Sequence, residues 1–188
     1  MARVNKLKAI GIVGSPRKNG NVDTLVQAVL GGAEQAGYQT KKYSLNEMKY
    51  SGCQACDYCK SHDRCRQKDD LTGLLQDMAE ADAVVFGSPI YFFQFTGQFR
   101  LMEDRMYSLI DAGFNSRLRP GKKAVIVTSQ GDPNPKSYEK AANEFADVLK
   151  LLGFEVKEII RMENGSARDA VLGRKDLLDK ARATGQSL

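Results

Sequence analysis

Several features that define other protein classes are missing from this sequence. No apolar run approaches the length that a membrane-spanning helix requires, so we expect no membrane association. Met1–Leu7 is polar and basic, and the apolar run after it is too short for a signal peptide, which predicts a cytoplasmic protein. No internal repeat or low-complexity stretch is present. The one histidine, His62, is assigned no role.

Clusters of one charge sign are also missing, although the net charge is +5. The C-terminal third mixes basic residues such as Arg161 and Arg174 with acidic residues such as Glu163 and Asp176. That mixture is typical of a solvated surface, so we expect no nucleic-acid partner. With 188 residues, 42% of them hydrophobic, the chain suits one domain over 1–188. A long irregular stretch at about 45–68 holds every cysteine and predicts a cysteine-rich insert.

Two familiar nucleotide-binding motifs are absent near the N-terminus. An apolar segment, 8–13, ends at Gly14, and a polar loop leads to an amphipathic stretch that begins near Asn21. Gly14 and Gly20 lack the Lys-Ser or Lys-Thr of a Walker A loop, and no Gly-x-Gly-x-x-Gly is present. A strand, a loop and a helix N-terminus still leave outward-facing N–H groups that suit a phosphate, and Arg17 can pair with its oxygens. The alternative is an ordinary strand-to-helix turn.

Apolar strand patterns alternate with helical patterns five times along the chain, which predicts a parallel sheet covered on both faces. We expect strands at 8–13, 40–44, 83–87, 124–128 and 155–160, and helices at about 22–36, 70–78, 96–110, 138–152 and 174–182. Ligands of such sheets lie at the carboxyl ends of the strands. The loops expected there are 14–21, 88–93 and 129–135, and the cysteine loop follows the second strand, so we expect it on the same side.

The second of these loops is rich in aromatic residues. Ser88-Pro89-Ile90-Tyr91-Phe92-Phe93 follows a buried strand directly. Aromatic faces and backbone N–H groups at such a place suit a flat, amphipathic ring system such as isoalloxazine. The alternative is that the aromatic side chains only plug the end of the sheet.

These stretches resemble a known family. Gly-Ser-Pro-Arg-Lys-Asn-Gly-Asn at 14–21, Gly-Ser-Pro-Ile-Tyr-Phe at 87–92 and Glu-Asp-Arg at 103–105 resemble the NADPH-dependent FMN reductase family of flavodoxin-like proteins. The cysteine stretch resembles the iron–sulfur flavoprotein branch of that family. The resemblance covers about 8–160. It implies a three-layer α/β sandwich with a five-stranded parallel sheet in the order 2-1-3-4-5, and a homodimer or homotetramer with the flavin near a subunit interface.

The resemblance also implies a set of cofactor-binding residues. The residues implied to hold the FMN phosphate are Ser15, Arg17, Asn19 and Asn21. Those implied to line the ring are Pro89, Ile90, Tyr91 and Phe92, and those implied to approach its polar edge are Thr128, Ser129 and Gly131. Val22 departs from the family, which often has a threonine there. No side chain need act as a general base, because the flavin carries the chemistry.

The four cysteines, Cys53, Cys56, Cys59 and Cys65, follow the pattern Cys-x2-Cys-x2-Cys-x5-Cys. Short spacings let one segment wrap a cubane cluster, and this spacing falls within the iron–sulfur flavoprotein pattern, which favours a [4Fe-4S] cluster over zinc. The alternative, that the cysteines are free or disulfide-linked, stays open. Asp104 and Arg105 are expected to form a structural pair or cap.

These observations predict an FMN-dependent oxidoreductase. It would pass electrons from NAD(P)H or a ferredoxin-type carrier to a small-molecule acceptor, with or without a [4Fe-4S] cluster. Three alternatives remain open: a cluster-free NAD(P)H:flavin or quinone reductase, a non-enzymatic electron-transfer flavoprotein, and a non-enzymatic phosphate-ligand binding protein with a structural metal.

Overall fold

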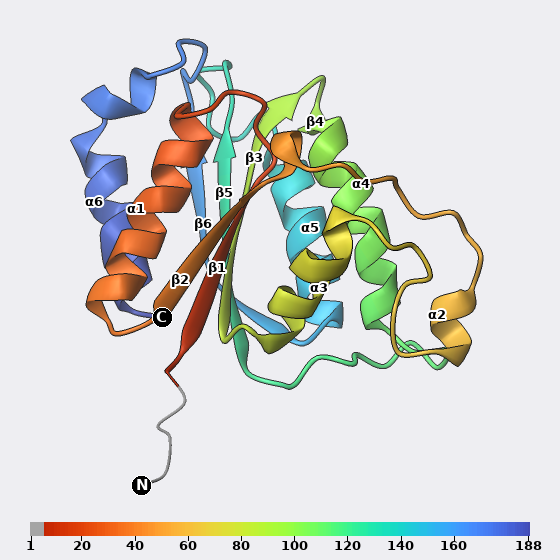
Figure 1. Ribbon diagram of the computed structural model, residues 1–188. Helices are drawn as coiled ribbons and strands as arrows, with labels where there is room; N and C mark the ends of the chain where they lie inside the picture. Colours follow the sequence, from red (N-terminus) through yellow and green to blue (C-terminus); the bar gives the residue numbers. More distant parts are fainter. Residues whose placement is uncertain (1–5) are drawn as a thin grey trace, which may run out of the picture.

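A twisted parallel sheet forms the centre of the computed structural model, which describes residues 6–188 (Figure 1). Its strands are β1 (Lys8–Val13), β2 (Gln39–Ser44), β3 (Ala83–Tyr91), β5 (Lys122–Ser129) and β6 (Phe154–Met162). They lie side by side in the order β2-β1-β3-β5-β6, which confirms the predicted order 2-1-3-4-5. A further short strand, β4 (Gln94–Phe95), pairs with the end of β3 in the antiparallel sense.

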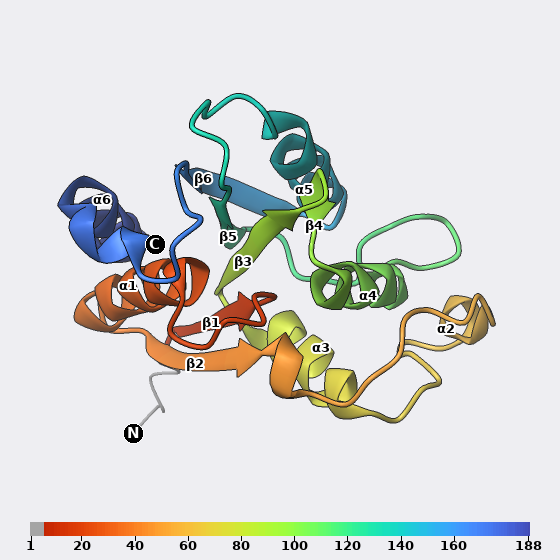
Figure 2. The same ribbon diagram turned by 90° about the horizontal axis from the view of Figure 1, so that it is seen from above.

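Helices cover both faces of the sheet (Figure 2). One face carries α1 (Asn21–Gln35) and α6 (Lys175–Gln186), and the other carries α3 (Asp70–Glu80), α4 (Gly97–Arg105) and α5 (Glu139–Leu151). Single turns complete the chain: the short helix α2 (Tyr58–Ser61) and the 3-10 turns Leu45–Glu47, Met106–Leu109 and Ala170–Gly173. The predicted three-layer sandwich is therefore confirmed. The predicted absence of a signal peptide concerns residues of which 1–5 lie outside the described part.

The core beneath α4 and α5 is aromatic. Phe86 of β3 lies edge-to-face against Phe145 of α5, with ring centroids 5.1 Å apart, and Phe145 meets Phe99 of α4 at 5.0 Å. All three rings are at most 2% exposed. Edge-to-face pairs of this kind add to the stabilisation by burial, so they fix α4 against the carboxyl half of β3. Met102, Met106 and Ile110 follow Phe99 at helical spacing, and all four side chains are buried in the core.

β3 and α6 each end four residues beyond the end that their sequence pattern indicates. The last helix continues to Gln186 through Thr184-Gly185, where a stop was expected near 182. Gly185 is needed inside the helix because a Cβ there would lie 1.9 Å from the carbonyl oxygen of Val29 in α1. β3 continues to Tyr91 because it pairs with β5 as far as Ser129 and then with β4.

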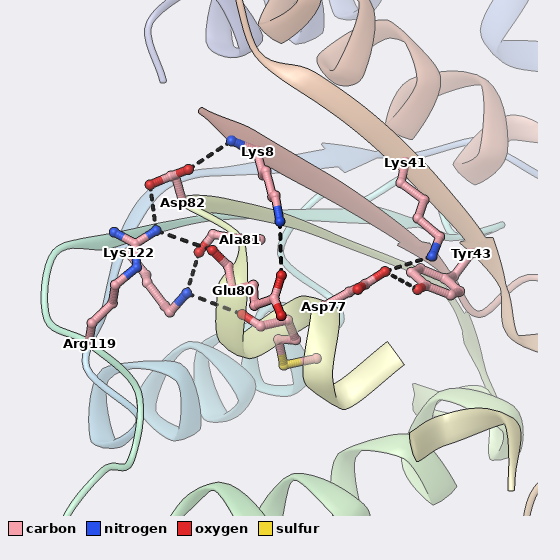
Figure 3. A network of polar contacts seen from close by, with 10 residues as sticks. Lys8, Lys41, Tyr43, Asp77, Glu80, Ala81, Asp82, Arg119 and Lys122 are labelled. Carbon is pink, nitrogen blue, oxygen red and sulfur yellow. Dashed lines mark hydrogen bonds and ion pairs between the residues drawn. The ribbon is translucent and has the colours of Figure 1, made fainter. Parts of the chain in front are cut away.

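A polar network closes the amino-terminal edge of the sheet (Figure 3). The Lys122 ammonium is fully buried and donates to the carbonyl oxygens of Met78 (3.2 Å) and Ala81 at the C-terminal end of α3. Arg119 pairs with Asp82 close by. These groups satisfy the last carbonyls of α3, which lack partners within the helix.

Within residues 6–188, none of the helices combines the length and apolar character needed to cross a bilayer.

Candidate functional site

The loops after β1 and β3 meet at the carboxyl edge of the sheet, where hydrogen bonds fasten them together. The Gly14 N–H donates to the carbonyl oxygen of Gly87 (2.8 Å). The Thr96 hydroxyl, which also caps α4, donates to the carbonyl oxygen of Gly14 (2.7 Å), and the Thr96 N–H donates to Ser88 Oγ (3.1 Å). Residues distant in the sequence are thus held as one rigid floor.

A cavity of about 240 Å³ opens above this floor. It brings together most of the residues predicted to bind the cofactor: Ser15, Arg17, Asn21, Pro89, Ile90, Tyr91, Ser129 and Gly131. It also brings in residues that were not predicted: Val22, Gln130, Gly165 and Ser166. The carboxyl ends of parallel strands are the expected place for a ligand in an open α/β sheet.

The N-terminus of α1 supplies positive potential at one end of the cavity. Gly20, the N-cap residue, offers no side chain to the first turn. In the described part of the chain, the backbone N–H groups of Asn21, Val22 and Asp23 therefore have no protein acceptor. Free N–H groups and the helix dipole together favour an anion such as a phosphate at this position.

Arg17 spans the mouth of this end of the cavity. Its Nη1 donates to the carbonyl oxygen of Ser166 on the opposite wall (2.9 Å), and its backbone N–H donates to Ser15 Oγ (3.1 Å). One such bond leaves other N–H groups of the exposed guanidinium free to face a ligand. Arg17 can therefore serve both as a clamp between two loops and as a charged donor.

The Asn21 side chain is occupied by the protein itself. Its Nδ2 donates to the carbonyl oxygens of Gly165 (3.0 Å) and Ala167 (2.7 Å), and its Oδ1 accepts from the Val171 N–H (3.0 Å). Both amide hydrogens are thereby used. A contact from Asn21 to a phosphate would come from its backbone N–H, and its side chain positions the loop that follows β6.

Three predicted residues lie outside the cavity lining. Asn19 has left-handed backbone (φ 54°), and its N–H donates to Asp23 Oδ2 (2.8 Å). Thr128 is buried in β5 beneath the lining. Phe92 is 96% exposed and points away from the protein. None of these three side chains lines the cavity, so their predicted contacts with the cofactor stay predictions.

Phe92 and Phe93 form the two-residue turn between β3 and β4. Both have positive φ, 46° and 71°, as a type I′ turn requires. Asparagine and glycine favour such a turn, whereas a bulky residue there is strained. The turn holds two exposed aromatic rings beside the Tyr91 side of the cavity.

The loop after β6 is the part of the site that sequence reasoning missed. The Gly165 N–H donates to the carbonyl oxygen of Gln130 (2.7 Å), so this loop lies directly on the loop after β5. A Cβ on Gly165 would lie 2.2 Å from Ser129 Oγ and 3.2 Å from the carbonyl oxygen of Gln130, so a larger residue would have to displace the Ser129 side chain that lines the cavity. The available signal was Asn164-Gly165-Ser166, a small polar loop at the carboxyl end of the fifth predicted strand.

The cysteine loop occupies a different place from the one predicted. It leaves the carboxyl edge after β2 but then runs down the outside of α4 (Figures 1 and 2), and α2 lies far from the carboxyl ends of the strands. Lys60 of α2 donates to the carbonyl oxygens of Tyr107 (3.1 Å) and Ile110 (3.0 Å), beyond the C-terminal end of α4. The expectation that the loop lies on the ligand side of the sheet is wrong, because these contacts anchor it at the other end of α4.

The thiols of this loop differ in exposure. Cys53 and Cys56 are exposed, Cys65 is half-buried and Cys59 is buried. Burial raises the pKa of the Cys59 thiol, and the charges of Cys65 and Cys53 add to the rise against the opposing effect of Lys60. Among residues 6–188, no three cysteine, histidine or acidic side chains converge closely enough to share a metal ion.

Arg105 takes a different partner from the one predicted. Its Nη1 and Nη2 donate to Asp69 Oδ2 (2.7 Å) and Oδ1 (3.1 Å), so the pair joins α4 to the residue just before α3. Asp104 is not its partner. Burial alone would raise the pKa of Asp69, but the hydrogen bonds and charge of Arg105 outweigh it and hold the pKa below its usual value.

Similarity to known proteins identifies the family of this chain. The model of the NADPH-dependent FMN reductase family matches residues 7–135. The chain belongs to this family, as the motifs predicted.

Several individual proteins are similar to this chain in sequence or in fold. An iron–sulfur flavoprotein of Archaeoglobus fulgidus is 33% identical over 147 residues, which is 78% of this chain and 64% of that protein. One from Methanocaldococcus jannaschii is 32% identical over 74% of this chain and 72% of that protein. An FMN-dependent NADH-azoreductase of Bacillus anthracis, solved in complex with FMN, has the same fold, with a TM-score of 0.70, 12% identity and coverage of 97% and 99%. The chain thus spans 64% of the length of the Archaeoglobus relative.

Proposed function

We propose that this protein is an oxidoreductase that binds FMN in the cavity at the carboxyl edge of the sheet and takes electrons from NAD(P)H or a ferredoxin-type carrier. The observation that carries the proposal is the combination of free N–H groups at the start of α1 with an aromatic wall at Tyr91 in one cavity. One end of the cavity suits a phosphate and the other suits a flat ring, as FMN requires.

The described side chains fit that cofactor. Ser15, Arg17 and the first N–H groups of α1 would hold the phosphate. Pro89, Ile90 and Tyr91 would line the ring, and the Ser129–Gly131 backbone would meet its polar edge. FMN itself supplies hydride and electron transfer, while the protein binds and orients it.

We propose further that Cys53, Cys56, Cys59 and Cys65 hold a [4Fe-4S] cluster. Thiolates are the ligands that such clusters take, and the similar proteins of Archaeoglobus and Methanocaldococcus are named iron–sulfur flavoproteins. Left-handed residues, Ala55 (φ 48°) and Asp57 (φ 50°), bend the backbone between the first three cysteines. Such bends are what a short segment needs to wrap a compact ligand. The exposed Cys53 and Cys56 would have to turn inward upon it.

The cavity and the cysteine loop lie at opposite ends of α4, and the proposed subunit contact lies beside the cavity. The cavity lies near the start of α4 and the loop near its end, and nine helical residues span about 13 Å. We propose a homodimer or homotetramer of a cytoplasmic protein, in which a second copy packs on the exposed rings of Phe92 and Phe93 beside the cavity. A small-molecule acceptor would then be reduced at the flavin.

One visible spectrum of protein purified without air tests both cofactors, and anaerobic addition of NADPH then tests the activity. A flavin spectrum that bleaches, with broad absorbance from the cluster and matching iron and sulfide, is the expected result. Flavin without iron would establish the cluster-free reductase, and flavin that NADPH leaves oxidised would favour an electron-transfer flavoprotein. A colourless protein that takes up no FMN would overturn the proposal.

A further inference from the structure

Asp23, in the first turn of α1, fastens the loop that precedes this helix. Its side chain is buried, and its Oδ2 accepts the backbone N–H of Asn19 (2.8 Å), the residue of the loop that has left-handed backbone. Gly20, the N-cap residue, has no side chain that could do this. An acidic side chain at the third helical position that reaches back to an N–H before the helix acts like one arm of a capping box. The Asp23 carboxylate therefore sets how the loop enters the helix.

Lys42, from the neighbouring strand β2, balances the charge of this carboxylate. Its Nζ donates to Asp23 Oδ1 (2.5 Å), which also accepts from Gln27 Nε2 one turn further along α1 (2.9 Å). Burial by itself raises the pKa of the Asp23 carboxyl, but the hydrogen bonds that it accepts, first of all from Lys42, outweigh burial and hold the pKa below its usual value. The carboxylate is thus ionised at neutral pH and is balanced by a cation from outside the loop.

The ionised carboxylate belongs to the same helical turn as the candidate phosphate site. Asn21 and Val22 line the cavity, and Asp23 follows them directly in α1. A negative side chain in this turn competes with a phosphate for the positive end of the helix dipole. Unbalanced, the Asp23 charge would repel a phosphate, whereas a carboxylate neutralised by Lys42 can hold the loop without that cost.

We infer that Asp23 and Lys42 form a positioning pair for the FMN phosphate, in which Asp23 shapes the binding loop and Lys42 cancels the repulsion between that carboxylate and the phosphate. The inference rests on the proposed FMN site. Neither side chain lines the cavity, so both act through the loop and the local field and not by contact with the ligand. Removing Lys42 alone should weaken binding of a phosphorylated flavin, and removing both charges should restore it.

Three variants separate the charge of the pair from its hydrogen bond. Lys42→Gln leaves the Asp23 charge unbalanced. Lys42→Gln with Asp23→Asn removes both charges but keeps an oxygen that can accept the Asn19 N–H, and Lys42→Gln with Asp23→Ala removes that acceptor as well.

The matched control is Lys41→Gln. Lys41 precedes Lys42 in β2, lies on the opposite face of the sheet and pairs with Asp77 of α3 (2.6 Å; Figure 3), so the control also removes a Lys–Asp pair from this strand. Circular dichroism checks the folding of each apoprotein before it is titrated with FMN and, separately, with riboflavin. A variant that only loosens the fold weakens both ligands, whereas the positioning role changes the affinity for FMN alone.

We expect FMN to bind roughly 5-fold more weakly to Lys42→Gln than to the control, with riboflavin affinity unchanged. The double variant with Asp23→Asn should return to within about twofold of wild type, and the one with Asp23→Ala should stay weaker for FMN. Should the variant with Asp23→Ala not fold, the other two decide.

Two results would overturn the inference while the FMN site stands. One is a wild-type ratio of FMN to riboflavin affinity in Lys42→Gln, and the other is an Asp23→Asn double variant that binds FMN no better than Lys42→Gln. Equal FMN affinity of the two double variants would overturn the role of Asp23 in shaping the loop. If wild type itself binds FMN no more tightly than riboflavin, the proposed phosphate site fails and this inference fails with it.

Discussion

Arg17→Ala is expected to weaken FMN binding by roughly 12- to 40-fold. A hydrogen bond from a charged group contributes about 1.5–3 kcal/mol, and each 1.4 kcal/mol corresponds to about tenfold in the dissociation constant. The lower half of that range applies because the Arg17 side chain is exposed and solvent screens its charge. The variant also removes the clamp to the Ser166 carbonyl, so the opposite wall of the cavity loses a support.

The assay is titration of apoprotein with FMN, followed by quenching of flavin fluorescence. Arg168→Ala is the matched control, because Arg168 carries the same charge and donates to the nearby carbonyl oxygen of Lys18, but does not line the cavity. We expect the control to change affinity by less than about threefold. An unchanged dissociation constant for Arg17→Ala, or an equal loss in both variants, would refute the assignment of Arg17 to the phosphate.

Three further predictions concern stability, each measured by urea unfolding. Phe92→Asn with Phe93→Gly should raise the free energy of unfolding of the monomeric chain, measured at a protein concentration where wild type and variant are both monomers, by about 1 kcal/mol, because the new residues favour the positive φ of the turn; a decrease under these conditions would contradict the strain. Asn21→Ala should lower the free energy of unfolding by about 2–3 kcal/mol, because the amide hydrogen bonds of the side chain are lost. A decrease of less than roughly 0.5 kcal/mol would refute the role of this side chain in holding the loop after β6. Burial lowers the pKa of Lys122 to about 8, below its value in the unfolded chain. As the pH rises, the native state therefore loses this proton at a lower pH than the unfolded chain does, which favours the native state. Relative to Lys122→Met, the free energy of unfolding of wild type should rise by about 1.4 kcal/mol per pH unit from about pH 8 to 9.5, and parallel pH profiles of the two proteins would contradict this.

Local signals sufficed for the sheet and the first loop. The apolar run before Gly14 and the amphipathic pattern after Asn21 fix a strand, a loop and a helix within one short segment. Alternation of such segments then gives a parallel sheet, since strand and helix periodicities are properties of the local chain. The order of strands came from family resemblance, and the structure confirms it.

Contacts between distant segments could not be predicted in this way. Asn21 was predicted from its place in the loop, but its side-chain partners lie 144 and more residues away, beyond the reach of any local pattern. The end of α6 depends on Gly185 lying against α1, although a glycine near a helix end normally indicates a stop. The descent of the cysteine loop along α4 depends on Arg105 and Lys60, whose partners no spacing reveals.

The most direct test of the central claim compares FMN with riboflavin on the same apoprotein. The two ligands differ only in the phosphate, which the N–H groups at the start of α1 and Arg17 would bind. Two charge-assisted bonds of about 1.5 kcal/mol each predict that FMN binds roughly 100-fold more tightly than riboflavin. Equal dissociation constants for the two ligands would contradict a phosphate site at the loop between β1 and α1.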